Sequence, residues 1–440
     1  DYYSIDPQYG KMEDFEELVN ECHNRGINVI IDFVMNHTSD TNKWFETAKN
    51  YLKDLGDEEV DIKKCPYVDY YNFTKEDKGS GYEQLEGTDW YYECRFWSEM
   101  PDLNLKSEQV RRELEDIVDF WLGKGVDGFR LDATTYFVNN DKEANIEILN
   151  WFNSYVKSIN NEAYIVGEAW TDEAEYMSMY ESGVDSFFNF AMGNKDGIIS
   201  KVASGQSDAS VYSSHIEDIS NIFNVDYKNQ TPIDAPFLSN HDTGRAAGYF
   251  AGDDSEACLK FAWGLNLLEG GTTFIYYGEE IGMKGSGKDE NKRVGMYWDD
   301  EEYEGKCVGP LDADNVKMKY PSLKDQKTDE YSIYSYIKQA IKLRNIYPEI
   351  ARGTNKEIKE LEEEGIGAFV KEYNDEQLLI IFNSSDESKE IDINDKADLD
   401  KNYKDMQLCG CLLPGEEKIE FDSNRVLIPS KGIVLLRHFT

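Results

Sequence analysis

The stretch Val126-Asp-Gly-Phe-Arg-Leu-Asp132 decides how this chain is interpreted. It reads as a buried strand that follows a helix, yet it carries Arg130 and Asp132, charges that a strand interior does not tolerate without partners. Other predicted strands also end in polar residues, namely Asn36 with His37, Glu168, and His241 with Asp242. Because the carboxyl ends of parallel strands lie at one edge, the pattern indicates that these side chains gather there.

Helices and strands alternate on both sides of this stretch. Apolar residues at helical spacing predict helices over 12–22 and 107–124, with Ser107 as the cap of the second, ahead of strands at 27–35 and 126–132. Further predicted helices are 142–159, 208–223, 255–268 and 331–345, and further predicted strands are 163–170, 185–190, 235–240 and 272–278. Such alternation implies a parallel sheet covered by helices.

Two segments depart from this alternation. Residues 38–105 are aromatic and charged without a clear helical period, and their length predicts an inserted subdomain or a functional lid. After Gly365, short alternating strands at 367–373, 378–383, 390–393, 418–421 and 433–438 predict a small all-β domain.

The composition limits the classes of partner. The chain has 440 residues, of which 40% are hydrophobic, and a formal net charge of −41. That length suits a large domain with a companion. The charge repels phosphate backbones and anionic lipids, so it disfavours nucleic acid and membrane surfaces as partners. No apolar run approaches the ~18–20 residues of a membrane span. The seven cysteines form no CxxC pair.

Three acids at three strand ends, Asp132, Glu168 and Asp242, indicate catalysis. A purely structural role would require a cation beside each of them, because an unpaired buried carboxylate is costly. No Cys or Ser nucleophile beside a base, no glycine-rich phosphate loop and no His/Cys metal spacing is evident. Carboxylates alone suit cleavage of a glycosidic bond, in which one acid attacks the anomeric carbon and another protonates the leaving oxygen.

Five motifs lie in a fixed order along the chain: Asp32-Phe-Val-Met-Asn-His37, Met100-Pro-Asp-Leu-Asn104, Gly128-Phe-Arg-Leu-Asp132, Val166-Gly-Glu168 and Phe237-Leu-Ser-Asn-His-Asp242. Together they resemble the signature regions of the α-amylase family, glycoside hydrolase family 13. The resemblance implies an α/β fold, a (β/α)8 TIM barrel whose first strands are missing from this chain, with an inserted domain B and a C-terminal all-β sandwich domain. The implied barrel is 1–37 and 106–350, domain B is 38–105, and domain C is 351–440.

The resemblance also implies roles for individual residues. Asp132 would be the nucleophile, Glu168 the general acid and then base, and Asp242 the group that binds sugar hydroxyls in subsite −1. The implied further substrate contacts are His37, Arg130, His241, Asp289 and Arg293. The implied reaction is retaining cleavage of α-1,4-glucosidic bonds in starch-like glucans or maltooligosaccharides, through a covalent glucosyl-enzyme.

Substrate preference leaves alternatives open. The segment Met100–Asn104 looks intermediate between the versions in oligo-1,6-glucosidases and neopullulanases, and Ala133 stands where α-1,6-glucosidases typically carry Val. Both features favour α-1,4 bonds. The alternatives are an α-glucosidase or oligo-1,6-glucosidase, a transglycosylase or phosphorolytic enzyme, and a non-catalytic domain similar to the amylase-like ectodomain of amino-acid transporter heavy chains.

The resemblance further implies a calcium ion held by Asn36 and Asp102, no organic cofactor, a monomer, and an extracellular or cell-surface location. The sequence opens at Asp1 without the strand, helix and second strand that family members supply first. Taken alone, such a chain is expected to be weakly stable and poorly active, because the open sheet edge leaves backbone groups unpaired.

Overall fold

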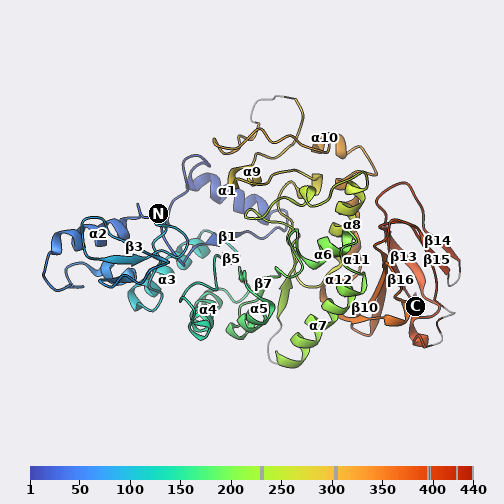
Figure 1. The fold of residues 1–440 in the computed structure, drawn as a ribbon, viewed down its shortest axis with the longest axis horizontal. Coiled ribbons are helices and arrows are strands. Elements are labelled where there is room, and N and C mark those ends of the chain that lie inside the picture. Colours follow the sequence, from blue (N-terminus) through green and yellow to red (C-terminus); the bar gives the residue numbers. More distant parts are fainter. Residues whose placement is uncertain (228–231, 302–305, 394–395, 397, 423–424, 439–440) are drawn as a thin grey trace. The chain divides into compact units, whose positions relative to one another are not determined.

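The chain divides into two compact units, Asp1–Phe188 and Asn189–Thr440. A computed structural model describes residues 1–227, 232–301, 306–393, 396, 398–422 and 425–438. Figure 1 shows the helices and strands of both units.

The first unit is built on a parallel sheet, as predicted. Its strands pair side by side in the order β1 (Ile30–Phe33), β5 (Gly128–Leu131), β6 (Tyr164–Gly167) and β7 (Ser186–Phe188). A helix precedes each strand along the chain: α1 (Met12–His23), α3 (Glu108–Gly123), α4 (Lys142–Ile159) and α5 (Glu173–Met179), the last followed by the 3-10 helix η2 (Tyr180–Ser182). The predicted helices and strands of this unit are therefore confirmed.

The strand β5 follows from its local sequence. The hydroxyl oxygen of Ser107 accepts the backbone N–H of Gln109 at 3.3 Å, which caps α3 as predicted. Gly125 then adopts a φ of +90°, a left-handed turn that glycine tolerates, before the chain enters β5. All four residues of β5 are buried, as expected for a strand covered on both faces. The strand therefore carries Arg130 into the interior and places Asp132 directly after its last residue.

Residues 38–105 contain a helix that the sequence interpretation missed. The helix α2 (Lys43–Leu55) buries Phe45, Ala48, Leu52 and Leu55, and Asn42 caps it by accepting the N–H of Trp44 at 2.8 Å. The expectation of no helical period was wrong here, because these apolar residues repeat every three to four positions among many charges. The 3-10 helix η1 (Pro66–Tyr70) follows, and β2 (Phe73–Thr74), β3 (Tyr82–Gln84) and β4 (Tyr91–Glu93) form a small antiparallel sheet with β4 in the middle.

The part of the second unit before the C-terminal sheets is mostly helical. It contains β8 (Ile233–Ala235), the helices α6 (Ile198–Ala203), α7 (Ser210–Asp226), α8 (Ser255–Leu268), α9 (Asp289–Lys292), α10 (Leu323–Gln326), α11 (Ile333–Ile346) and α12 (Pro348–Arg352), and the 3-10 helices η3 (Ala246–Gly248) and η4 (Glu279–Ile281). The helices predicted over 208–223, 255–268 and 331–345 are confirmed.

Two strands predicted in this region need correction. The strand expected over 235–240 ends at Ala235, and 272–278 contains no strand, only a parallel bridge between Phe237 and Phe274. Pro236 accepts the N–H of Phe274 at 2.8 Å, but it has no N–H of its own to extend the pairing. Both segments nevertheless run parallel, as predicted.

The C-terminal part folds as two antiparallel sheets, which confirms the predicted all-β domain. One sheet has the order β13 (Gln407–Leu412), β16 (Ile433–Arg437), β11 (Glu376–Asn383), β10 (Ile366–Tyr373) and β9 (Thr354–Glu357); the other has β12 (Lys389–Asp392), β15 (Arg425–Ile428) and β14 (Glu420–Asp422). The 3-10 helices η5 (Lys359–Leu361) and η6 (Lys401–Tyr403) accompany them. Along β11, alternate residues enter two different hydrophobic clusters, so the larger sheet is buried on both faces.

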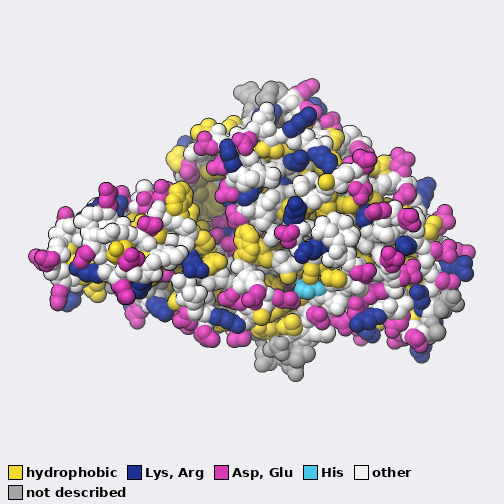
Figure 2. Space-filling view, in the orientation of Figure 1, with side chains coloured by type: hydrophobic (Ala, Val, Ile, Leu, Met, Phe, Trp, Pro, Cys, Tyr) yellow, Lys and Arg dark blue, Asp and Glu magenta, His cyan; other side chains and the backbone are white. Residues whose placement is uncertain are grey.

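Charge is distributed as the composition suggests. Acidic side chains are scattered across the face seen in Figure 2, which agrees with 87 Asp and Glu against 46 Lys and Arg in the chain. Among the residues that the structure describes, no helix is both long and apolar enough to cross a membrane.

Candidate active site

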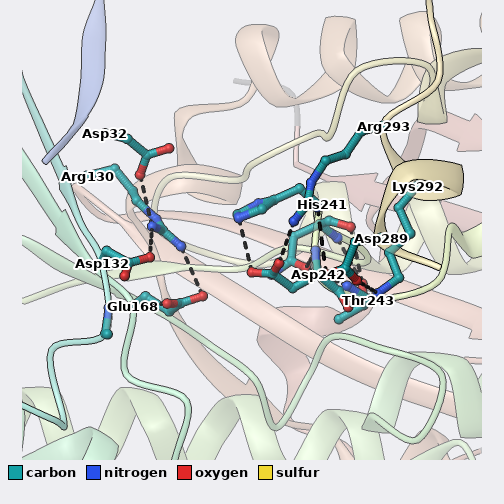
Figure 3. A network of polar contacts seen from close by, with 12 residues as sticks. Asp32, Arg130, Asp132, Glu168, His241, Asp242, Thr243, Asp289, Lys292 and Arg293 are labelled. Atoms are coloured by element: carbon teal, nitrogen blue, oxygen red, sulfur yellow. Dashed lines mark hydrogen bonds and ion pairs between the residues drawn. The ribbon is translucent and has the colours of Figure 1, made fainter. Parts of the chain in front are cut away.

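Arg130 contacts three carboxylates that come from the neighbouring strands β1, β5 and β6 of the first unit (Figure 3). Its Nη1 donates to Oδ1 of Asp132 at 2.6 Å and to Oδ1 of Asp32 at 2.9 Å. Its Nη2 lies 2.9 Å from Oε1 of Glu168. Since β5 and β6 pair in parallel, Asp132 and Glu168 follow strand ends at the same edge of the sheet, and one guanidinium reaches both.

The backbone beyond β5 holds Glu168 in place. Ala133 adopts a φ of +52°, which is uncommon for a residue with a Cβ, and its N–H donates to Oε2 of Glu168 at 3.2 Å. The hydroxyl of Thr134 donates to the carbonyl oxygen of Glu168 at 2.8 Å. With 8% of its surface exposed, Glu168 is fixed from both its side chain and its main chain.

The carboxylates around Arg130 keep its guanidinium positively charged. Burial disfavours the charged form of Arg130, but the nearby carboxylates of Glu168, Asp32 and Asp132 outweigh it and raise the Arg130 pKa above its ordinary value. The guanidinium therefore stays charged and offsets the repulsion between the acids.

His37 lies after β1 in the same unit. Burial lowers the pKa of His37, and the charge of Asp132 only partly opposes that effect, so the imidazole is neutral near pH 7. Its ring meets Phe96 edge-on with 5.5 Å between the centroids. A cavity of about 470 Å³ is lined by His37 together with Thr38, Trp97 and Glu99, and Trp97 is 57% exposed. An aromatic face beside hydroxyl and carboxyl groups suits a sugar ring.

Asn36, which directly precedes His37, contacts Asp102. The Asn36 Nδ2 donates to Asp102 Oδ1 at 3.3 Å, and Oδ2 of Asp102 accepts the backbone N–H of Arg95 at 3.0 Å. Asp102 is 5% exposed, and burial raises its pKa to about 7. Calcium prefers six to eight oxygen ligands, and this pair offers the right donor type but only part of that number. No cluster of three or more His, Cys, Asp or Glu suited to a metal is found among the described residues.

Asp242 belongs to a group of polar residues in the second unit, which Figure 3 labels. The amide oxygen of Asn240 accepts the N–H groups of Asp242 at 2.9 Å and Thr243 at 3.0 Å. The carboxylate of Asp242 pairs with Nη2 of Arg293 at 2.9 Å and with Nε2 of His241 at 3.0 Å. Asp242 therefore has a histidine and an arginine at its side chain.

The short helix α9 supplies the cations of this second group. Arg293 directly follows α9, and Asp289 begins it. Lys292 donates to Oδ1 of Asp289 at 2.8 Å and to the carbonyl oxygen of Asp242 at 2.7 Å. Lys292 lowers the pKa of Asp289 through this hydrogen bond, so Asp289 is ionised at neutral pH.

The structure therefore brings the predicted residues together within each unit. Arg130, Asp132 and Glu168 form one group, and His241, Asp242, Asp289 and Arg293 form the other. Sequence reasoning missed Asp32 and Lys292 as members of these groups. Asp32 carried a signal, because it interrupts an apolar strand. Lys292 carried none, because it is one of several charges in the short segment 288–293.

Paired acids at parallel strand ends, with an arginine between them, suit the chemistry of a glycoside hydrolase. Comparison with known proteins specifies the kind. The family model described as alpha amylase, catalytic domain, matches residues 1–353. The chain belongs to this family, the α-amylase family of glycosidases.

Similar proteins and solved structures agree with this family assignment. Alpha-amylase 3 of Dictyoglomus thermophilum is 36% identical over 409 residues, covering 89% of this chain and 77% of that protein. An oligo-1,6-glucosidase of Parageobacillus thermoglucosidasius is 28% identical, covering 88% of this chain and 80% of that protein. The structure of Eubacterium rectale Amy13B matches with a TM-score of 0.94 at 44% identity, covering 100% of this chain and 84% of that one. These similarities confirm the predicted barrel fold with its C-terminal β domain and an α-glucan hydrolase as the class of enzyme.

Proposed function

We propose that the protein hydrolyses α-1,4-glucosidic bonds of starch-like glucans or maltooligosaccharides with retention of anomeric configuration. The observation that carries the proposal is the single guanidinium of Arg130 that touches both Asp132 and Glu168. A similar protein that is named an α-amylase, from Dictyoglomus thermophilum, supports the choice of bond.

Asp132 and Glu168 divide the chemistry. In the first step an oxygen of Asp132 attacks the anomeric carbon while the bond to the leaving oxygen breaks, and Glu168 gives that oxygen its proton. In the second step the Glu168 carboxylate takes a proton from water, whose oxygen attacks the same carbon and releases Asp132. Two inversions at one carbon give retention.

The remaining residues prepare this exchange. The charged Arg130 holds Asp132 through a hydrogen bond and fixes the direction of the carboxylate. Neutral His37 donates one ring N–H to a sugar hydroxyl. Asp242 and His241 bind sugar hydroxyls, and Arg293 holds the Asp242 carboxylate in place for that contact.

Product analysis tests the proposal and its rivals. Incubation with amylose, pullulan and isomaltose, followed by thin-layer chromatography and proton NMR of the first-formed anomer, should give α-anomeric maltooligosaccharides from amylose. Cleavage of isomaltose instead would favour an α-1,6-glucosidase. Glucosyl products that grow with added sugar acceptors or phosphate would favour transfer or phosphorolysis.

The nucleophile is tested by substitution. Asp132→Asn keeps the shape but removes the attacking charge, so hydrolysis should fall by about 10³-fold or more, as in other enzymes that lose a catalytic group. Oligosaccharide binding, measured by calorimetry, should persist. An Asp132→Asn variant that still hydrolyses amylose at the wild-type rate would remove Asp132 from this role.

We also propose that Asn36 and Asp102 hold a structural calcium ion, with main-chain carbonyls and water completing its ligands. The buried Asp102 carboxylate supports the proposal, because a divalent cation would offset the cost of keeping it charged. The ion would brace the chain between β1 and α3 and would take no part in the reaction.

A further inference from the structure

We propose that Lys292 is a positioning residue for Asp242, whose main chain it clamps while it also orients Asp289. The inference rests on the proposed function, in which Asp242 binds the sugar. Neither the sequence motifs nor the comparisons assign a role to this lysine.

The contacts of Lys292 are those of a buried clamp and not of a surface charge. Only 9% of the residue is exposed. Its ammonium group donates to the carbonyl oxygen of Asp242 at 2.7 Å and to the carboxylate of Asp289 at 2.8 Å (Figure 3). Burying an ammonium group is costly unless its hydrogen bonds are made, so these two contacts fix its position.

The main chain of Lys292 is itself anchored. Its carbonyl oxygen accepts hydrogen bonds from Nε of Arg245 at 3.1 Å and from the hydroxyl of Tyr276 at 3.1 Å. The Arg245 guanidinium is buried and lies 4.4 Å from the ring centroid of Tyr276 and 4.7 Å from that of Tyr277. A lysine held this firmly at its backbone can transmit that rigidity through its side chain to Asp242.

Asp242 is consequently held at each of its polar groups by a different residue. Asn240 accepts its N–H, Lys292 donates to its carbonyl oxygen, and Arg293 pairs with its carboxylate. Arg293 binds the carboxylate of Asp242, whereas Lys292 binds its main chain. A displacement of about 1 Å in such a contact can cost on the order of 10²-fold in rate.

Kinetics of full-chain variants on maltopentaose test the role. Lys292→Met removes the ammonium group but keeps the apolar stem, and should lower kcat by about 10- to 100-fold with KM changed less than about threefold. Lys292→Arg, which keeps a cation, should recover kcat to within about fivefold of wild type. The control is Lys288→Met, because Lys288 stands in the same segment and pairs with Asp314 at 2.9 Å on the surface; it should stay within about twofold.

Crystal structures of wild type and Lys292→Met supply a readout that does not need turnover. The main chain at Asp242 should shift in the variant while the thermal midpoint changes little. Wild-type kcat and KM in Lys292→Met, or an unmoved Asp242, would overturn the proposal. If wild type cleaved no α-glucan, the proposed function would fail, and the position of Asp242 would still decide for or against Lys292.

Discussion

Glu279 is a carboxyl group that the second unit buries completely. Burial raises its pKa to about 7, although Arg245 at 3.5 Å opposes the shift. Between about pH 4.5 and 7 the native state then holds a proton that the unfolded state has lost, so stability falls as pH rises through this window. This shift changes the free energy of unfolding by about 3 kcal/mol across the window, since one pKa unit is about 1.4 kcal/mol.

The substitution Glu279→Gln removes this titration and keeps the shape. The thermal midpoint of the variant should fall less between pH 5 and 7 than that of wild type, by about 3 °C for a chain of this size. Calorimetry at several pH values measures the difference. Glu280→Gln is the matched control, because Glu280 is the next residue along the chain and should leave the slope nearly intact. Equal slopes in wild type and Glu279→Gln would refute the assignment.

At the scale of one element, α3 depends on its cap. The hydroxyl of Ser107 accepts the N–H of Gln109 at 3.3 Å and donates to Asp69 Oδ2 at 2.5 Å. Ser107→Ala removes both contacts, and the free energy of unfolding should fall by about 0.5–2 kcal/mol. Urea unfolding followed by tryptophan fluorescence measures it. Ser107→Thr keeps a hydroxyl and should lose less; a Ser107→Ala variant as stable as wild type would show that the cap contributes nothing.

Elements were predictable from sequence where one periodic pattern dominates. The helix predicted over 142–159 matches α4 at both ends, because apolar residues repeat at helical spacing over its whole length. The helix α2 was missed because its apolar positions are diluted by charges. The strand predicted over 235–240 was overextended, and the one predicted over 272–278 is only a bridge at Phe274, since apolar content alone does not reveal the missing N–H of Pro236.

The residues of the candidate site could be predicted from sequence only where burying such a residue type costs free energy. A charged residue in a buried strand, such as Arg130, requires a reason, and strand order then brings Asp132 and Glu168 to it. Lys292 could not be found this way, because its contact with the carbonyl oxygen of Asp242 joins two segments that lie 50 residues apart in the chain. Long-range main-chain contacts leave no trace in local pattern.

At the scale of the whole molecule, the net charge of −41 is the dominant electrostatic property. Like charges repel within a compact chain, and dissolved salt screens them over about 8–10 Å at 0.1–0.15 M. Raising the NaCl concentration from about 10 mM to about 0.5 M increases this screening and should therefore raise the thermal midpoint. Scanning fluorimetry measures this, with a neutral osmolality control such as glycerol in matched steps. A midpoint that falls with salt would mean that attractive ion pairs outweigh the overall repulsion.

Calcium should add to this general screening by acting on one site. A ligand that binds only the native state stabilises the whole chain by mass action, by about 2.7 kcal/mol at a hundredfold excess over its Kd. If Asn36 and Asp102 hold calcium, CaCl2 should raise the midpoint more than NaCl at equal ionic strength, and chelation by EDTA should reverse the excess. Asp102→Asn should lose the excess but keep the response to NaCl, because it removes one ligand charge and leaves the rest of the surface unchanged. Identical responses of wild type to the two salts would refute the calcium site and leave the screening argument standing.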